Sequence, residues 1–155
     1  LPLIADFNDD NRGSALCEVL DVNAAPAGMA HDILSYGEYI YTYTGGAHGM
    51  EAYIIHNYSL TTGDPVSEDD LFIDDYFEPM CKMLVEALIH QTENVNTERE
   101  LRKLGYWLED IVPNDNFFVS EEGITYVYTP YEIAPYALGS TAIFLPWSVL
   151  TPVLR

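Results

Sequence analysis

Two runs of alternating side chains on either side of a glycine-rich interruption constrain the fold of this chain most. In residues 36–43 tyrosines occupy every second position from Tyr39 onward, and in residues 52–58 large side chains fill both alternating sets. A period of two residues is typical of β-strands. The two runs, joined through the sequence TGGAHG, therefore predict an antiparallel hairpin. Because both sides of the second strand carry large residues, we predict a central strand covered on both faces.

The pattern changes to helical spacing in residues 75–91. Large apolar residues recur there three or four positions apart, namely Phe77, Met80, Cys81, Leu84, Val85 and Leu88. We expect Asp75 to cap this helix together with Glu78, because an acidic residue three positions after the N-cap residue completes a capping box. A second helix is expected to begin at Thr97, with Glu100 in the matching position, and to carry Leu101, Leu104 and Leu108.

Strand patterns return in the last third of the chain. Residues 117–120 and 124–128 flank the sequence EEG and predict a second hairpin, residues 141–145 a further strand, and residues 147–154 a short helix or turn. Strands precede and follow the helices without the strand–helix–strand alternation of parallel sheets. The predicted fold class is α+β, with a mainly antiparallel sheet packed against one long and one shorter helix.

The first 32 residues are the least legible part of the chain. Residues 6–14 are turn-like, residues 15–22 fit either a short helix or a strand, and residues 23–29 form a connector rich in small residues. A length of 155 residues suffices for one domain with a hydrophobic core. The only cysteines, Cys17 and Cys81, show no CxxC spacing, so we expect two buried thiols, although an oxidising compartment would permit them to pair.

Acidic residues outnumber basic ones by 25 to 6, which gives a net charge of −19. Nucleic acid is therefore not expected as a partner, because phosphate binding requires a basic patch. Anionic membrane surfaces are disfavoured for the same reason, and no apolar run is long enough to span a bilayer. A basic partner would be attracted to such a surface; the alternative is that the charge serves solubility alone.

His48 lies in the loop between the first two predicted strands, beside Gly45, Gly46 and Gly49. Glycines permit backbone conformations that bring a loop close to a ligand, and an exposed imidazole can act as a base or a metal ligand. Metal centres combine several ligands at recognisable spacing, and no such set accompanies His48. We predict no metal site and no cofactor, and expect His48 to fix the loop through a hydrogen bond.

The sequence TPYEIAPYALG contains the second candidate site. Pro130 and Pro135 hold the backbone extended, and each is followed by a tyrosine, Tyr131 or Tyr136. Rigid segments that carry tyrosines are effective anchors for protein partners; the alternative is an edge segment whose tyrosines pack beneath the sheet. Glu132 lies among apolar neighbours and needs a polar partner if it is buried.

Several motifs follow one another in a fixed order: GGAHG, NYSLTTG, DLF, NFF, YEIAPYALG and LPW. Over residues 33–154 they closely resemble the RsiV/PdaC-like extracytoplasmic domain family. One branch of that family is an anti-sigma factor whose outer domain binds lysozyme. Another is fused to a peptidoglycan deacetylase, whose catalysis lies in a separate domain. The resemblance implies that residues 33–155 form the family domain, that residues 1–32 are the remnant of a preceding companion domain, and that the protein is extracytoplasmic, in the periplasm or at the cell surface.

Three functional hypotheses follow. The first is a noncatalytic binding or sensor domain that recognises a basic protein such as lysozyme, or a cell-wall component, and meets the membrane only through an anchor outside this chain. Its expected contact residues are Pro130, Tyr131, Glu132, Pro135, Tyr136, Gly45, Gly46 and His48. The second is a cell-wall glycan hydrolase or deacetylase-associated module that uses His48 and Glu132 as acid and base. The third is a purely structural module of an envelope lipoprotein. We also predict a hydrogen bond between His48 and Glu132.

Overall fold

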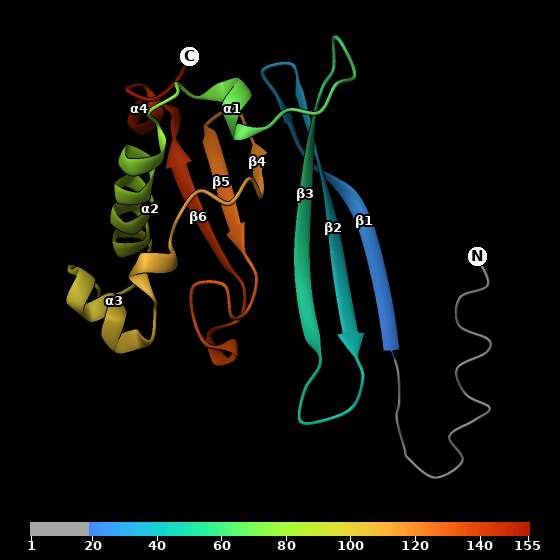
Figure 1. Cartoon of the computed structure of the whole chain (residues 1–155), viewed down its shortest axis with the longest axis vertical. Coiled ribbons are helices and arrows are strands. Elements are labelled where there is room, and N and C mark those ends of the chain that lie inside the picture. The colour runs from blue at the N-terminus through green and yellow to red at the C-terminus, as the bar shows by residue number, and fades with distance from the viewer. Residues whose placement is uncertain (1–18) are drawn as a thin grey trace.

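The computed structural model describes residues 19–155 and shows two antiparallel sheets of three strands each (Figure 1). The first sheet has the strand order β1-β2-β3 and consists of β1 (Val19–Ala30), β2 (Ile33–Tyr43) and β3 (Met50–Ser59). The second has the order β4-β5-β6 and consists of β4 (Phe117–Val119), β5 (Gly123–Tyr128) and β6 (Thr141–Pro146). The predicted α+β class is confirmed. The predictions for residues 6–14 and for Cys17 lie outside the described residues.

The longest helix covers one face of the second sheet. The helices are α1 (Glu68–Leu71), α2 (Phe77–Gln91), α3 (Glu98–Leu104) and α4 (Trp147–Leu150), with the 3₁₀ turns η1 (Leu108–Asp110) and η2 (Tyr136–Leu138). Helix α2 runs beside β6 (Figure 1), and its Met80, Leu84 and Leu88 side chains are buried. They share one core with Tyr126 and Ile143 of the sheet, so the predicted helix is confirmed. Phe77, the first residue of the predicted apolar set, is instead 47% exposed.

Helix α3 begins as the sequence predicts. The Thr97 hydroxyl accepts a hydrogen bond from the Glu100 backbone N–H at 3.4 Å, and the Glu100 carboxylate accepts one from the Asn96 backbone N–H at 2.9 Å. The hydrogen bonds that the Glu100 carboxylate accepts from the Asn96 N–H and from the Thr97 hydroxyl lower its pKa. The helix is shorter than expected, because it ends at Leu104, which is 49% exposed, and Leu108 belongs to the separate turn η1.

The capping box predicted for α2 is wrong. The N-cap residue is Tyr76 and it makes no side-chain capping bond, so Asp75 and Glu78 do not cap the helix. The Tyr76 hydroxyl instead donates a hydrogen bond to the carboxylate of Glu68 at 2.8 Å. The residue before this helix therefore makes a side-chain contact with α1 in place of a capping bond.

Glu68 is a buried carboxylate with several hydrogen bonds. Only 6% of its surface is exposed. Besides the bond from Tyr76, it accepts one from the Asp115 backbone N–H at 2.8 Å, and the Asp115 carboxylate accepts one from the Glu68 backbone N–H at 2.9 Å. Burial raises the pKa of Glu68, and the hydrogen bonds from Tyr76 and Asp115 oppose that shift in part. Burial, followed by the neighbouring Glu68 carboxylate, raises the pKa of Tyr126.

The first sheet corrects two sequence predictions. Residues 23–29, which we expected to form a connector, belong to β1 and pair with β2. Strand β3, which we expected to be central, is an edge strand of this sheet, and its Ile54 and Tyr58 are 39% and 40% exposed. Alternation identifies a strand but not its neighbours. Whether the large residues on each face are buried depends on which other elements pack against that face, and the strand's own sequence does not contain this information.

Side-chain amides, rather than a backbone ladder, join the two sheets. The Asn116 carboxamide oxygen accepts a hydrogen bond from the Ile55 N–H at 2.8 Å, and its amide group donates to the Tyr53 carbonyl at 2.9 Å and the Val127 carbonyl at 2.8 Å. The Asn116 side chain therefore makes hydrogen bonds to backbone groups of β3 and β5, as the backbone of a strand between them would. Because it pairs with backbone groups of both sheets, Asn116 fixes their relative position.

A second connection lies deeper between the sheets. The Ser35 hydroxyl donates to the Asn57 side-chain oxygen at 2.6 Å and accepts from the Val119 N–H at 2.9 Å, while the Asn57 amide donates to the Phe117 carbonyl at 2.9 Å. Ser35 and Asn57 are buried, so each polar group is satisfied within the protein. Gly28 permits this close approach, because a Cβ atom there would lie 2.6 Å from the Val119 carbonyl oxygen.

The two faces of the first sheet differ. The inner face carries Ser35 and Asn57 and contacts β4. We call the opposite side the outer face; the strand register assigns to it Leu20, Val22, Ala24, Pro26, Met29, Leu34, Tyr36, Glu38, Ile40, Thr42, Met50, Ala52, Ile54, His56 and Tyr58. None of α1–α4 lies on this outer face (Figure 1).

Candidate functional site

Three aromatic side chains from the two candidate loops come together at one end of the molecule. The imidazole of His48 stacks on the ring of Tyr136 with a centroid separation of 3.8 Å and an interplanar angle of 16°. The ring of Tyr131 lies 5.8 Å from that of Tyr136. We call His48, Tyr131 and Tyr136 the aromatic patch. It connects the β2–β3 loop with the segment between β5 and β6, which lies far away in the sequence.

The glycines of the β2–β3 loop place His48 in this patch. Gly45 and Gly46 have φ values of 97° and 100°, a region that favours glycine, and the Tyr43 hydroxyl donates a hydrogen bond to the Gly46 carbonyl at 2.9 Å. At Gly49, a Cβ atom would lie 2.3 Å from the Tyr41 hydroxyl oxygen. The His48 ring nitrogen Nδ1 lies 3.0 Å from the Gly49 carbonyl oxygen, which can only accept, so a hydrogen bond here requires a proton on Nδ1.

The other half of the patch is anchored by buried neighbours. Ile133 and Ala134 are 1% and 2% exposed, and the Ile133 carbonyl accepts a hydrogen bond from the Trp107 N–H at 2.8 Å. Tyr131 is held with φ at 72°, in the left-handed region that is costly for a residue with a bulky side chain. Its side chain is 49% exposed. The segment thus holds an exposed aromatic ring in a strained and well-anchored backbone conformation.

The predicted hydrogen bond between His48 and Glu132 is wrong. The two carboxylate oxygens of Glu132 accept hydrogen bonds from the Asn114 amide at 2.7 Å and from the Thr129 N–H at 2.8 Å. Glu132 therefore closes the turn that begins at Thr129, while His48 meets Tyr136. The two loops do lie together, but ring stacking rather than a charged hydrogen bond brings His48 against the second loop.

One further hydrogen bond connects the first sheet with the same segment. The Ser140 hydroxyl donates to the Glu51 carboxylate at 3.2 Å. The Tyr39 hydroxyl contacts the other oxygen of Glu51 at 3.5 Å, and its ring lies 5.0 Å from that of Tyr53. Tyr39, Glu51 and Tyr53 share the inner face of the first sheet. The Ser140–Glu51 hydrogen bond therefore joins the first sheet to the segment that carries Tyr131 and Tyr136.

The predicted contact residues differ in accessibility. Tyr131, Pro135, Gly46 and His48 are exposed. Tyr136, Glu132 and Gly45 are half-buried, and Pro130 is buried beneath the loop. Sequence reasoning did not include Trp107 and Leu138, which are 37% and 40% exposed. The Trp107 N–H donates to the Ile133 carbonyl, and Leu138 lies in η2 of the same segment. The use of these residues in binding stays a prediction.

Within residues 19–155, no group of three or more histidine, cysteine, aspartate or glutamate side chains is arranged to hold a metal ion. Glu132 and His48 do not contact each other, so the structure supplies no hydrogen-bonded acid–base pair from these two residues. Among the described helices, none has the length and apolar character needed to cross a membrane.

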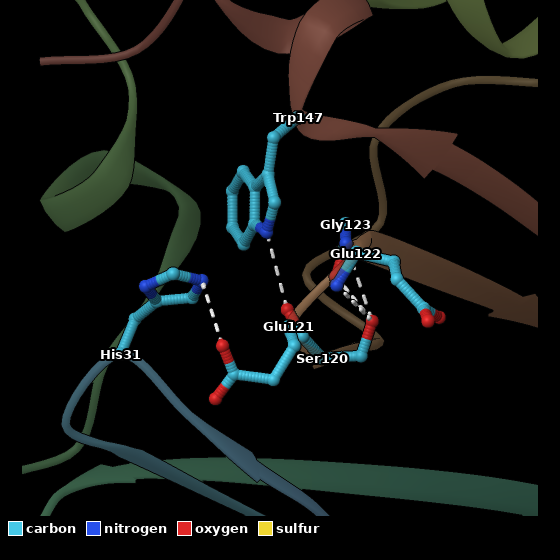
Figure 2. Close-up of polar contacts among 6 residues, drawn as sticks. All are labelled: His31, Ser120, Glu121, Glu122, Gly123 and Trp147. Atoms are coloured by element: carbon cyan, nitrogen blue, oxygen red, sulfur yellow. Dashed lines mark hydrogen bonds and ion pairs between the residues drawn. The ribbon is translucent and has the colours of Figure 1, made fainter.

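A second aromatic contact lies at the opposite end of the sheets (Figure 2). His31, in the β1–β2 turn, packs edge-on against Trp147 with ring centroids 5.1 Å apart, and its Nε2 atom lies 4.0 Å from the Glu121 carboxylate. The Trp147 indole N–H donates to the Ser120 carbonyl at 3.2 Å. Trp147 therefore joins the first turn of one sheet to the β4–β5 turn of the other. The adjoining shallow hollow measures about 420 Å³ and is bordered by Ser148, Thr151 and Leu154.

Comparison with known proteins identifies the family of this chain. A family model described as "Protein of unknown function (DUF3298)" matches residues 69–148, just over half of the chain. The chain belongs to the DUF3298 family. No curated protein matches it. The narrower resemblance to the RsiV/PdaC-like proteins is consistent with this family and stays a prediction.

Two solved structures of the family are similar to this chain. A DUF3298 member from Bacteroides fragilis has 29% sequence identity and a TM-score of 0.85, and the match covers 94% of this chain and 58% of that one. A DUF3298 protein from Pseudomonas aeruginosa has 18% identity and a TM-score of 0.71, with 89% and 62% covered; this likeness shows the fold alone. The chain spans less than two thirds of each of these structures.

Proposed function

We propose that this DUF3298 chain is a noncatalytic extracytoplasmic binding or sensor domain whose aromatic patch contacts a basic protein. The observation that carries the proposal is the aromatic patch itself, in which His48 stacks on Tyr136 beside an exposed Tyr131. Tyrosine and histidine rings held in place offer a large contact area with little loss of side-chain entropy on binding. The location, the anchor in the full-length protein and the choice of lysozyme as a model partner come from the motif resemblance.

The backbone around Tyr131 supports this proposal. A tyrosine with φ at 72° is energetically unfavourable, yet the neighbouring buried residues Ile133 and Ala134 hold the segment in place. Strained residues of this kind concentrate at binding sites, where the cost is offset by a preformed contact surface. The exposed ring is thus presented before any partner arrives.

Charge supports a basic partner. The chain carries a net charge of −19, and Glu51 of the first sheet accepts a hydrogen bond from Ser140 in the segment that carries Tyr131 and Tyr136. A negative surface raises the rate of encounter with a cationic protein and repels acidic ones. Rings of tyrosine and histidine can also receive a lysine or arginine side chain through a cation–π contact.

The experiment is a binding measurement with hen egg-white lysozyme as the probe, by biolayer interferometry at low and at physiological salt. Cytochrome c, a basic protein of different shape, serves as the charge control. We expect Tyr131→Ala to weaken lysozyme binding by about tenfold, the effect of a central aromatic anchor. Tyr58→Ala, which removes a comparably exposed tyrosine at the far end of β3, should leave binding unchanged.

Three outcomes would count against the proposal. Absence of lysozyme binding at low salt removes lysozyme as the model partner. Equal affinity for lysozyme and cytochrome c would show that net charge alone, rather than a specific contact, accounts for the binding. If Tyr131→Ala and Tyr58→Ala weaken lysozyme binding equally, the aromatic patch is not the specific contact site.

A further inference from the structure

The outer face of the first sheet is an apolar surface that no helix of residues 19–155 covers. Of the fifteen residues that the strand register assigns to it, only Glu38, Thr42 and His56 have polar side chains other than tyrosine. Six large apolar residues on it are 39–66% exposed, namely Leu20, Val22, Met29, Met50, Ile54 and Tyr58. Contiguous apolar surfaces of this extent mark interfaces in soluble proteins.

The second sheet shows how this protein covers such a surface. One face of β4-β5-β6 packs against α2, whose Met80 and Leu84 side chains are fully buried. The first sheet has the same number of strands, and these are longer, yet no described helix lies on its outer face (Figure 1). An antiparallel sheet with an apolar face is stable when that face is packed against another layer.

The dimensions of the outer face fit one helix. Strand β2 has 11 residues. With strands about 4.8 Å apart and a rise of about 3.4 Å per residue, the face measures roughly 10–15 Å by 35 Å. An α-helix is about 10–12 Å across with its side chains, and about 20 residues span 30 Å.

The charge of the outer face specifies the chemistry of that helix. Glu38 is its only acidic residue in a chain of net charge −19, and it is half-buried in the middle of the five cross-strand rows. A second copy of this chain would bring two such carboxylates together in an apolar interface, which is unfavourable. A helix that presents one lysine or arginine among apolar residues would satisfy Glu38.

We propose that an amphipathic helix from another part of the same full-length polypeptide covers the outer face and presents one basic residue to Glu38. The two solved relatives support a source within the same polypeptide, because the region similar to this chain makes up only 58% and 62% of them. A tethered helix also binds without the entropic cost of bimolecular association. This inference concerns a different surface from the aromatic patch and does not rest on the proposed function.

The experiment measures how fast a maleimide reagent labels single cysteines placed on this surface. Val22→Cys and Ile54→Cys report on the two edge strands of the outer face, and Ala142→Cys, an exposed position on β6, is the strand-matched control. Cys17 and Cys81 are replaced by serine and alanine in all variants. Each variant is made both as the 155-residue chain and as the complete gene product.

We expect fast labelling of all three cysteines in the 155-residue chain. In the complete protein, the two outer-face cysteines should react at least about tenfold more slowly, since the helix must open before the reagent enters, while the Ala142→Cys control keeps its rate. Adding Glu38→Lys to the complete protein should restore fast labelling of the Ile54→Cys variant, and Glu38→Gln should restore it to a smaller extent.

Several results would overturn the proposal. Equal labelling rates in the shorter chain and the complete protein would show that no other part of the polypeptide covers the face. Slow labelling already in the shorter chain would assign the cover to residues 1–18 or, if light scattering gives a dimer, to a second copy. If Ile54→Cys in the complete protein still reacts slowly after Glu38→Lys is added, the proposal that a basic residue of the helix pairs with Glu38 is refuted.

Discussion

Replacing Asn116 with aspartate tests whether side-chain amides hold the two sheets together. The substitution keeps the size of the side chain and the oxygen that accepts the hydrogen bond from the Ile55 N–H at 2.8 Å. It removes the amide group that donates to the Tyr53 carbonyl at 2.9 Å and the Val127 carbonyl at 2.8 Å. A carboxylate oxygen then faces two carbonyl oxygens.

The expected loss of stability follows from these contacts. Two lost hydrogen bonds cost about 1 kcal/mol each, and the unpaired acceptors left in a half-buried site add about 1 kcal/mol or more. We therefore expect Asn116→Asp to lower the free energy of unfolding by about 2–4 kcal/mol at pH 7. The surface substitution Asn96→Asp, at an exposed position, is the control and should change it by less than about 0.5 kcal/mol.

The loss should also depend on pH in a defined direction. A protonated carboxyl can again donate a hydrogen bond to one of the carbonyls, so the folded state favours the neutral form and raises the pKa of the introduced carboxyl above its value in the unfolded chain. The folded state of the variant then binds a proton more tightly than its unfolded state. The stability of the variant relative to wild type therefore falls as the pH rises from the pKa of this carboxyl in the unfolded chain to its higher pKa in the folded protein.

Urea denaturation followed by tryptophan fluorescence, at pH 4 and pH 7, measures both effects. We expect the difference between wild type and Asn116→Asp to be smaller at pH 4 than at pH 7. An unchanged free energy of unfolding at pH 7 would refute the role of Asn116 in joining the sheets. If Asn116→Asp lowers the free energy of unfolding equally at pH 4 and pH 7, the introduced carboxyl does not face the Tyr53 and Val127 carbonyl oxygens as described.

Two further predictions concern Glu68 and Gly28. Because burial raises the pKa of Glu68, the native state holds its proton more tightly than the unfolded state, so the stability of Glu68→Gln relative to wild type should increase as the pH rises from about 4. Denaturation at several pH values tests this, and a difference independent of pH would contradict it. Gly28→Ala should destabilise the protein by about 1–3 kcal/mol, because the new Cβ would lie 2.6 Å from the Val119 carbonyl oxygen. Thermal unfolding compares it with Gly37→Ala, where the Cβ would meet Ala27 at an ordinary 3.6 Å; equal losses would refute the close approach.

Local patterns predicted most of the individual elements. The alternation of Tyr39, Tyr41 and Tyr43 lies within β2, and Thr97 caps α3 through Glu100 as expected. These features depend on residues close together in sequence, for which backbone period and capping are decisive. The capping box predicted at Asp75 is wrong although its residues are also local: Tyr76 is the N-cap residue, and its hydroxyl bonds to Glu68 of α1 instead of capping α2.

The candidate site was predicted in part. The sequence identified both loops of the aromatic patch, and the structure brings His48 and the YEIAPY segment together. The predicted partner of His48 was wrong. Glu132 accepts hydrogen bonds from Asn114 and Thr129, and the His48 imidazole stacks on Tyr136. Several acceptors and rings compete at such a contact, and only the three-dimensional arrangement selects among them.

The sequence by itself determined the hairpins, the main helical spacing, the α+β class and the strongly acidic surface, because these follow from short-range periodicity and from composition. Only the tertiary structure decided that the strands divide into two sheets, that Asn116 joins them, and that no described helix lies on the outer face of the first sheet. The physical reason is the same in each case. A strand carries hydrogen-bonding groups along both edges and side chains on both faces, and its sequence does not say which of them will be covered.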